Sequence, residues 1–418
     1  MSRRVVVTGT GLLTAVGKDV QSSWASLLAG NSGVATIQSF DPSDYPVRFA
    51  GEVTDFVADD YIDRKEIKRT DRYAQLAIGA TVQAMREAGL DEDRSSIDPH
   101  TFGVIMGSGI GGIGTFEEQH GRFIAKGPSR VSPFFVPMFI ADIAAGLISI
   151  RYGAKGPNYA TVSACASGAH AIGNAFRSIM AGESEIMITG GTEASVTPMT
   201  VSGFAAMNAL SERNETPSTA SRPFDATRDG FVLGEGAGVL VLEELAHARA
   251  RGAPIIAELA GFGQTADAYH ITAPATGGEG AARAMKAALR NAGAAPREVG
   301  YINAHGTSTP ANDVNETAAI KAVFGDHAAK LIVGSTKSMT GHTLGAAGGV
   351  EGVITALVCR NGIIPPTINY SEPDPACDLD YDTEGPDERP VDLALSNSFG
   401  FGGHNVSLAI RRWDDGRE

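Results

Sequence analysis

The sequence predicts an α/β fold built from two similar halves. Short apolar runs that end in glycine alternate with stretches of helical periodicity, a pattern typical of parallel-rich sheets covered by helices. The same landmarks recur in the same order in both parts of the 418-residue chain, and no serine-, proline- or charge-rich linker separates them. We therefore expect two βαβαβ-type halves related by internal duplication, residues 1–252 and residues 253–418.

Four pairs of strand-like segments carry the predicted duplication. In order along the first half, the pairs are residues 4–11 with 255–263, residues 102–112 with 299–309, residues 185–194 with 330–339, and residues 238–244 with 405–411. Helical spacing lies between them, from Tyr73 to Ala88 in the first half and over residues 281–292 in the second. A further strand at 159–162 leads through a turn into an amphipathic helix that runs to about Gly182.

Cys165 stands in that turn, within the small-residue segment SACASG. A strand-to-helix turn lined by small residues presents a nucleophile, and a helix N-terminus biases a thiol toward thiolate. We expect Cys165 to act through a thioester. Cys359 and Cys377 lack this setting, and we expect both to be structural. Three cysteines in so long a chain fit a reducing compartment without disulfides.

Two histidines far downstream, His305 and His342, each end a strand-like run in a turn rich in glycine and threonine. Together with Cys165 they allow three interpretations: thioester chemistry, a zinc site, or a Cys-His protease. The separations of 140 and 37 residues match no metal-ligand spacing and no CxxC pair is present. A protease would leave the second histidine unexplained, so thioester chemistry is favoured.

Lys337 and Glu316 are the charged candidates near these histidines. Lys337 precedes His342 by five residues in a tight turn, where a buried electrostatic role is expected. Glu316 lies in a helix predicted over residues 313–324, where it complements the helix dipole or holds Lys337 or a water molecule.

Two phenylalanines, Phe399 and Phe401, stand among glycines in the segment NSFGFGGHN. Flanking glycines allow a hinge that swings a ring or aims backbone N–H groups. The alternative is that these rings only pack in the core.

Composition and motifs exclude several functions. A net charge of −14 leaves no basic surplus for nucleic acid, although residues 64–69 (RKEIKR) form a local basic cluster. The glycines of residues 107–112 follow a strand-like run, but no acidic residue supports a dinucleotide site there. The longest apolar stretch, residues 134–150, contains Pro137 and Asp142 and is too short to span a bilayer. We expect a soluble, cytoplasmic protein with no redox cofactor and no signal peptide.

Four segments follow one another along the chain: ACAS, NAHGTSTP, STKSMTGH and SNSFGFGGHN. In this order they resemble the β-ketoacyl-acyl-carrier-protein synthases of the thiolase superfamily, especially the chain-elongating enzymes of bacterial fatty acid synthesis. The resemblance covers the whole chain through GSGIGG, VSPFFVP, SRPFDATRDGFVLGEGAG and DAYHITAP. It implies a thiolase-like fold with α-β-α-β-α layers and a decarboxylative Claisen condensation that lengthens an acyl chain by two carbons. The alternative is a ketosynthase of a polyene or polyketide cluster.

The resemblance implies a role for each candidate catalytic residue. Cys165 takes the acyl chain from acyl carrier protein, and His305 and His342 stabilise the enolate formed when malonyl-carrier protein loses carbon dioxide. The backbone N–H groups of Cys165 and Phe401 form an oxyanion hole, and Phe401 also resembles the family's gating phenylalanine. Lys337 and Glu316 orient the second histidine and its surroundings.

The resemblance also implies binding residues and partners. The residues expected to contact the phosphopantetheine arm or the acyl chain are Thr272, Thr307, Thr309, Ile110, Phe204 and Phe399. A structural Na⁺ or K⁺, present in some members, would be held by Asn303, Glu351, Ser396 and Asn405. No other cofactor is implied. The expected partners are acyl carrier protein, docked on residues 64–69, and a second copy of the chain in a homodimer, with no nucleic acid and no membrane.

Two related functions are disfavoured, and three residues depart from the family pattern. A non-catalytic chain-length factor should lack the nucleophile that Cys165 supplies, and a thiolase using free coenzyme A needs a second cysteine as base. Asn312 stands where the pattern has glycine, and His404 where threonine is common beside the gate. Asn208 replaces an arginine implicated in carrier contact, which weakens that part of the docking prediction.

Overall fold

The computed structural model describes residues 3–416 and contains strands and helices in alternation. The main strands of the first half are β1 (Val5–Leu13), β4 (Phe102–Gly107), β5 (Asn158–Thr161), β6 (Ile186–Glu193) and β7 (Gly236–Glu244). Those of the second half are β8 (Ala257–Ala266), β9 (Tyr301–Asn303), β10 (Ile332–Gly334), β13 (Leu393–Gly400) and β14 (His404–Arg412). Two small hairpins pair β2 (Val34–Thr36) with β3 (Phe49–Gly51) and β11 (Ile363–Ile364) with β12 (Asp387–Glu388).

Thirteen α-helices are present among the described residues. In the first half they are α1 (Val20–Leu28), α2 (Arg64–Ile67), α3 (Arg72–Glu87), α4 (Ile113–Lys126), α5 (Phe135–Phe139), α6 (Ile143–Tyr152), α7 (Ser167–Ala181), α8 (Pro198–Ala206) and α9 (Leu245–Ala250). In the second half they are α10 (Glu279–Asn291), α11 (Pro310–Phe324), α12 (Lys337–Thr340) and α13 (Ala347–Asn361). None of the described helices is both long and apolar enough to cross a membrane.

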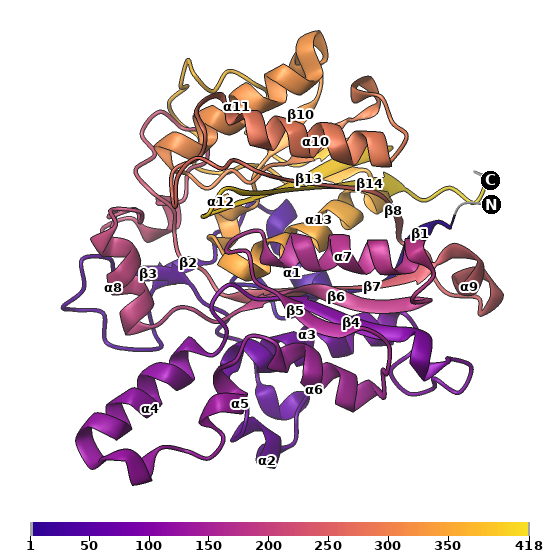
Figure 1. Ribbon diagram of the computed structural model, residues 1–418. Coiled ribbons are helices and arrows are strands. Elements are labelled where there is room, and N and C mark those ends of the chain that lie inside the picture. Colours follow the sequence, from indigo (N-terminus) through magenta and orange to yellow (C-terminus); the bar gives the residue numbers. More distant parts are fainter. Residues whose placement is uncertain (1–2, 417–418) are drawn as a thin grey trace.

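The elements stack in five layers (Figure 1). Helices α3 and α6 cover one outer face, α10 and α11 cover the other, and α7 and α13 lie between the two halves of the sheet. Strand residues alternate between the layers: Ile105 of β4 packs in the central core, whereas its neighbours Val104 and Met106 pack toward α3 and α6. This confirms the predicted α-β-α-β-α architecture.

The strands form one continuous mixed sheet in the order β10-β9-β13-β14-β8-β1-β7-β6-β4-β5. Of its nine neighbouring pairs, four are parallel and five are antiparallel. The prediction of parallel-rich sheets is therefore wrong. One reason is local: β13 and β14 are joined by a short turn, and a tight turn can connect only antiparallel strands.

The order of strands is the same in both halves when read outward from the central β1·β8 pair. It confirms three of the four predicted strand correspondences, because β1 matches β8, β4 matches β9, and β7 matches β14. The fourth is wrong, since β6 occupies the place of β13, and β10 occupies the edge place of β5. Glycine-ended runs look alike in sequence, whereas a strand's place in the sheet depends on its neighbours. The division at residue 252 stays a prediction.

Two helix starts differ from the prediction. Helix α7 begins at Ser167, so Cys165 lies just outside it. Helix α11 begins at Pro310 rather than at residue 313, because Thr309 caps it through a hydrogen bond from the Asn312 N–H and proline suits the first helical position. Glu316 therefore lies one turn further into the helix than expected.

Candidate active site

A cavity of about 460 Å³ contains most of the candidate site residues, drawn from both halves of the chain. The predicted residues that line it are Cys165, His305, His342, Ile110, Phe204, Thr272, Thr307, Thr309, Phe399 and Phe401. Asn208, Asn312 and Asn405 also line it. Lys337, Glu316 and Glu351 are buried behind this wall, each with at most 2% of its surface exposed.

The turn that carries Cys165 is held in an unusual backbone conformation. Ala164 has a φ of +50°, in the left-handed region that non-glycine residues rarely adopt. Ser167 stabilises the turn, because its hydroxyl donates to the Ala164 carbonyl at 2.7 Å and accepts from the Ser163 N–H at 2.9 Å. The turn therefore presents the sulfur from a fixed backbone.

Burial dominates the electrostatics of the Cys165 thiol. It raises the pKa of Cys165 to about 12, although the Lys337 charge and the N–H groups of Phe401 and of Cys165 itself lower it. The predicted bias toward thiolate is present in the N–H groups that lower the pKa, but desolvation outweighs it, and the pKa of the thiol stays raised. The same N–H groups were predicted to form the oxyanion hole, and both lie at the sulfur.

His305 and His342 meet edge to face, with ring centroids 5.3 Å apart and planes at 85°. Both are 3% exposed, and burial together with the Lys337 charge holds the pKa of each well below the ordinary value of histidine. Neither Nδ1 atom has a hydrogen-bond partner among the described residues. Two neutral imidazoles thus meet at the cavity wall.

The two neutral histidines should make the fold sensitive to acid. Below a pH of about 6.5 these histidines become protonated in the unfolded chain but not in the folded chain. The free energy of unfolding therefore decreases as the pH is lowered. When the pH is lowered from 7 to 5.5, the free energy of unfolding of His342→Gln should decrease by about 1 kcal/mol less than that of the unmodified chain. Urea denaturation at both pH values measures this, and equal losses would show that His342 is not held neutral.

Glu316 holds the backbone next to the first histidine. Its carboxylate accepts hydrogen bonds from the N–H groups of His305 at 2.9 Å and Gly306 at 2.8 Å, and from the Asn397 amide at 3.2 Å. The resemblance implied that it orients the second histidine and its surroundings. Its direct contacts are with the backbone of His305, whose ring lies against that of His342.

Lys337 forms a buried ion pair with Glu351 of α13, and each side chain is 2% exposed. The ammonium group lies near enough to Cys165, His305 and His342 to lower the pKa of all three. Burial raises the pKa of Glu351 to about 7 even beside Lys337. The predicted buried electrostatic role of Lys337 matches this geometry, with Glu351 as its partner.

All four predicted cation ligands are buried, and two of them are neighbours. Asn303 and Ser396 are direct neighbours across β9 and β13. Asn303 Oδ1, Ser396 Oγ and Glu351 Oε2 are buried and have no hydrogen-bond partner among the described residues. Oxygen donors of this kind fit a hard monovalent cation.

Asn405 differs from the other three. It lies near the start of β14, lines the cavity, and donates from its amide to Asp267 Oδ1 at 2.7 Å. Its prediction as a cation ligand therefore disagrees with the structure. Asn397, next to Ser396 in β13, faces the other side of the strand, where its amide donates to Glu316 Oε1 at 3.2 Å.

The turn between β13 and β14 lies directly against the nucleophile turn. A Cβ atom at Gly400 would lie 2.8 Å from the Ser163 carbonyl oxygen and 3.1 Å from the Cys165 nitrogen, so only glycine allows this approach. The Phe401 ring lies 6.5 Å from the Phe204 ring, and the Gly402 N–H donates to the Ile271 carbonyl at 2.8 Å. The turn therefore contacts both the side of the cavity that carries Phe204 and the loop that carries Thr272.

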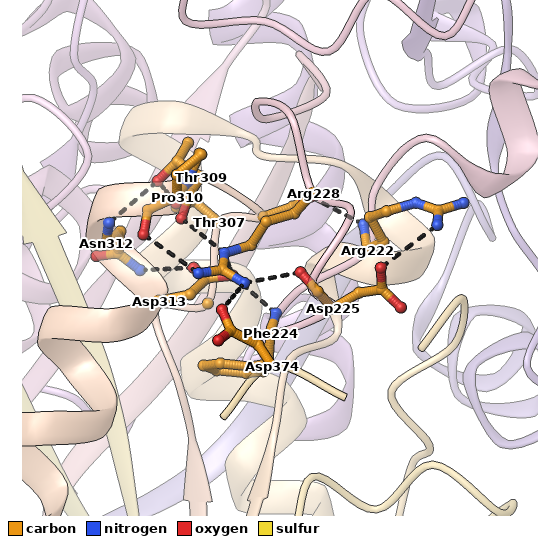
Figure 2. Close-up of polar contacts among 12 residues, drawn as sticks. Arg222, Phe224, Asp225, Arg228, Thr307, Thr309, Pro310, Asn312, Asp313 and Asp374 are labelled. Atoms are coloured by element: carbon orange, nitrogen blue, oxygen red, sulfur yellow. Dashed lines mark hydrogen bonds and ion pairs between the residues drawn. The ribbon is translucent and has the colours of Figure 1, made fainter. Parts of the chain in front are cut away.

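A buried arginine supports the opposite wall, where Thr307 and Thr309 lie (Figure 2). Arg228 donates to the Thr309 and Pro310 carbonyls, both at 3.3 Å, and pairs with Asp374 at 2.7 Å. Sequence reasoning missed Arg228, although it stands in the motif SRPFDATRDG. The sequence did offer one signal for Arg228, which is a charged residue within a segment of tight turns.

Comparison with known proteins places these features in context. The family described as β-ketoacyl synthase, N-terminal domain, matches residues 2–248, and the corresponding C-terminal domain matches residues 256–371. A protein of Synechocystis sp. named 3-oxoacyl-[acyl-carrier-protein] synthase 2 is 53% identical over 98% of both chains. A protein of the same name from Staphylococcus aureus is 51% identical over 99% of both chains.

Solved structures agree with the fold. A type II polyketide ketosynthase, AntDE, solved in complex with its acyl-carrier protein AntF and bound to a hexaketide, superposes with a TM-score of 0.90. It is 36% identical, and the match covers 99% of this chain and 100% of the other.

Proposed function

Because this chain belongs to the β-ketoacyl synthase family, we propose that it lengthens acyl chains by decarboxylative condensation with a malonyl thioester. The observation that carries the proposal is one cavity in which a cysteine meets two neutral histidines. Cysteine is both nucleophile and leaving group, and neutral imidazole N–H groups are suited to an enolate oxygen.

In the loading step, Cys165 attacks the carbonyl carbon of an acyl thioester. The N–H groups of Cys165 and Phe401 stabilise the negative oxygen of the tetrahedral intermediate. The thiol of Cys165 loses its proton as the carbon–sulfur bond forms, and the phosphopantetheine thiol leaves with a proton.

In the condensing step, the malonyl thioester loses carbon dioxide and its bonding electrons form an enolate. The imidazole N–H groups of His305 and His342 donate to the enolate oxygen, and their low pKa leaves them neutral for that task. The enolate carbon attacks the acyl-Cys165 carbonyl, the carbon–sulfur bond breaks, and a 3-oxoacyl thioester two carbons longer is released.

The decisive test is incubation with malonyl-carrier protein and acyl-carrier proteins of graded chain length, with products read by mass. A single two-carbon extension supports acyl elongation for fatty acid synthesis. Repeated extension without reduction would favour the second candidate, a polyketide ketosynthase, to which the AntDE structure is related at 36% identity. The 51–53% identity to the 3-oxoacyl-[acyl-carrier-protein] synthases favours the first. Absence of any condensation would refute both.

Phe401 is proposed to gate the entry of the acyl chain. Its ring faces Phe204 across the cavity, and the glycines on its C-terminal side, at 402 and 403, have positive φ values of +86° and +73° that permit the turn to rearrange. Phe401→Ala should slow acyl loading on the order of tenfold and change malonyl decarboxylation little. Intact-mass and carbon dioxide assays measure the two steps. Equal effects on both steps would refute gating.

We propose acyl carrier protein as the partner of the basic cluster at residues 64–69. Its two arginines and two lysines are exposed, with Arg64 paired to Asp59 at 3.1 Å. Exposed charges of this kind raise the rate at which an acidic partner associates. Three free cysteines support the proposal that the protein works in the reducing cytoplasm.

We further propose a homodimer formed along the edge strand β5. This strand ends the sheet, and an exposed strand edge is a template for pairing with another chain. Large apolar side chains are exposed in the same region of the chain; they are Phe116, Phe123, Ile124, Phe134, Val136, Ile140, Ile150, Tyr159 and Val162. Such a surface is typical of an interface.

We also propose that Asn303, Ser396 and Glu351 hold Na⁺ or K⁺. The support is the set of three unpartnered buried oxygens described above. The ion would fix the orientation of the Glu351 carboxylate that pairs with Lys337.

A further inference from the structure

Glu193, the last residue of β6, is a buried carboxylate that has no cationic partner in the part of the chain that the structure describes. It is 0% exposed and accepts four hydrogen bonds. The donors are the N–H groups of Gly109 at 2.7 Å, Gly345 at 3.0 Å and Ile110 at 3.2 Å, and the Ser108 hydroxyl at 3.0 Å. Burial raises the pKa of Glu193, but because every partner is a donor, all four hydrogen bonds lower it and favour the ionised carboxylate.

These four bonds join two walls of the cavity across the halves of the chain. Ile110 belongs to the predicted acyl-chain wall, and Gly345 follows His342 by three residues. A Cβ atom would lie 2.8 Å from the carboxylate at position 109 and 2.5 Å from it at position 345. Both glycines are therefore needed for the backbone to approach Glu193.

We propose that Glu193 is a positioning residue of the condensation reaction, which fixes the Ile110 wall against the segment that follows His342 and places a negative charge behind Cys165. The inference rests on the proposed function and adds to it a residue that makes no contact with the reacting atoms. The rate of acyl loading and the acidity of the Cys165 thiol then both depend on the buried Glu193 carboxylate.

The charge gives this role a distinctive signature. Glu193 raises the pKa of Cys165, in opposition to Lys337. Removing the charge should make the thiol more acidic and faster to alkylate, while loosening the Ile110 wall should slow acyl transfer. A residue with a merely structural role would change both rates in the same direction.

The experiment compares Glu193→Gln with the unmodified chain and with Glu243→Gln. Glu243 is a matched control, since it is also 0% exposed and multiply hydrogen-bonded, but its partners Thr8, His247 and Arg251 do not line the cavity, whereas the Glu193 partners Gly109 and Ile110 do. In Glu193→Gln, loading from acyl-carrier protein should fall on the order of tenfold, and iodoacetamide alkylation of Cys165 between pH 7 and pH 9 should become faster. If Glu193→Gln changes both rates only as Glu243→Gln does, the inference is wrong.

A second pair of variants separates charge from position. Glu193→Asp keeps the charge but is one methylene shorter, so alkylation should stay at the unmodified rate while loading falls. Ser108→Ala removes one of the four donors and should show a smaller loss of loading, which keeps the test decisive if Glu193→Gln does not fold. Loading at the unmodified rate in both variants would refute positioning. Failure of the unmodified chain to load would instead refute the proposed function.

Discussion

Replacing Cys165 with alanine should abolish acylation of the protein by acyl-carrier protein. Alanine has no nucleophile, and the other two cysteines are buried outside the cavity, at 0% exposure for Cys359 and 1% for Cys377. The thioester adduct, measured as a mass increase on the intact chain, should fall by at least roughly a thousandfold. Cys377→Ala is the matched control and should load normally. A persistent adduct on another cysteine would overturn the assignment of Cys165.

Replacing Cys165 with glutamine should separate the two half-reactions. The glutamine amide resembles an acyl thioester, with its oxygen toward the N–H groups of residues 165 and 401, and leaves His305 and His342 in place. Malonyl decarboxylation should therefore continue while condensation is lost. A complete loss of carbon dioxide release in a folded variant would contradict the proposed role of the histidines.

Replacing Lys337 with methionine should be the most destabilising of these changes. It leaves the carboxyl group of Glu351 buried and unpaired, which costs about 3 kcal/mol in the free energy of unfolding. Burial already raises the pKa of Glu351 to about 7. The carboxylate can therefore take up a proton, which limits the loss of stability. Urea denaturation measures the loss, and decarboxylation should fall on the order of tenfold as the histidines lose their charged neighbour.

The double variant Lys337→Met with Glu351→Met provides the control for that prediction. It removes both charges, and apolar replacements of a buried ion pair are often neutral in stability. Stability should return while decarboxylation stays low. A double variant as unstable as the single one would show that volume, and not the unpaired carboxylate, causes the loss.

Local sequence predicted the residues of the site better than it predicted their contacts. The strand-to-helix turn of Cys165 and the glycine-rich turns of His305 and His342 are readable from neighbouring residues, and all three line the cavity. The partner of Lys337 was not readable, because Glu351 lies on a helix that reaches Lys337 only through the tertiary fold. The direct contact of Glu316 with the His305 backbone was not readable for the same reason.

Two further differences from the sequence-based predictions have a common physical origin. The thiolate prediction for Cys165 used the helix dipole, which is local, whereas the desolvation that overrides it depends on everything packed around the sulfur. The pairing of residues 185–194 with 330–339 used a shared apolar pattern, whereas strand order is decided by long-range neighbours. Glu193 escaped notice because its four donors come from turns far apart in sequence.

The equivalence of β5 and β10 in the sheet bears on how the site is divided between the halves. The turn after β5 carries Cys165, and the segment after β10 carries Lys337 and His342, so equivalent places in the sheet hold the nucleophile in one half and the charged and imidazole groups in the other. Neither half contains a complete set. Two halves with the same strand order thus carry different chemical groups, and the site is complete only where they meet.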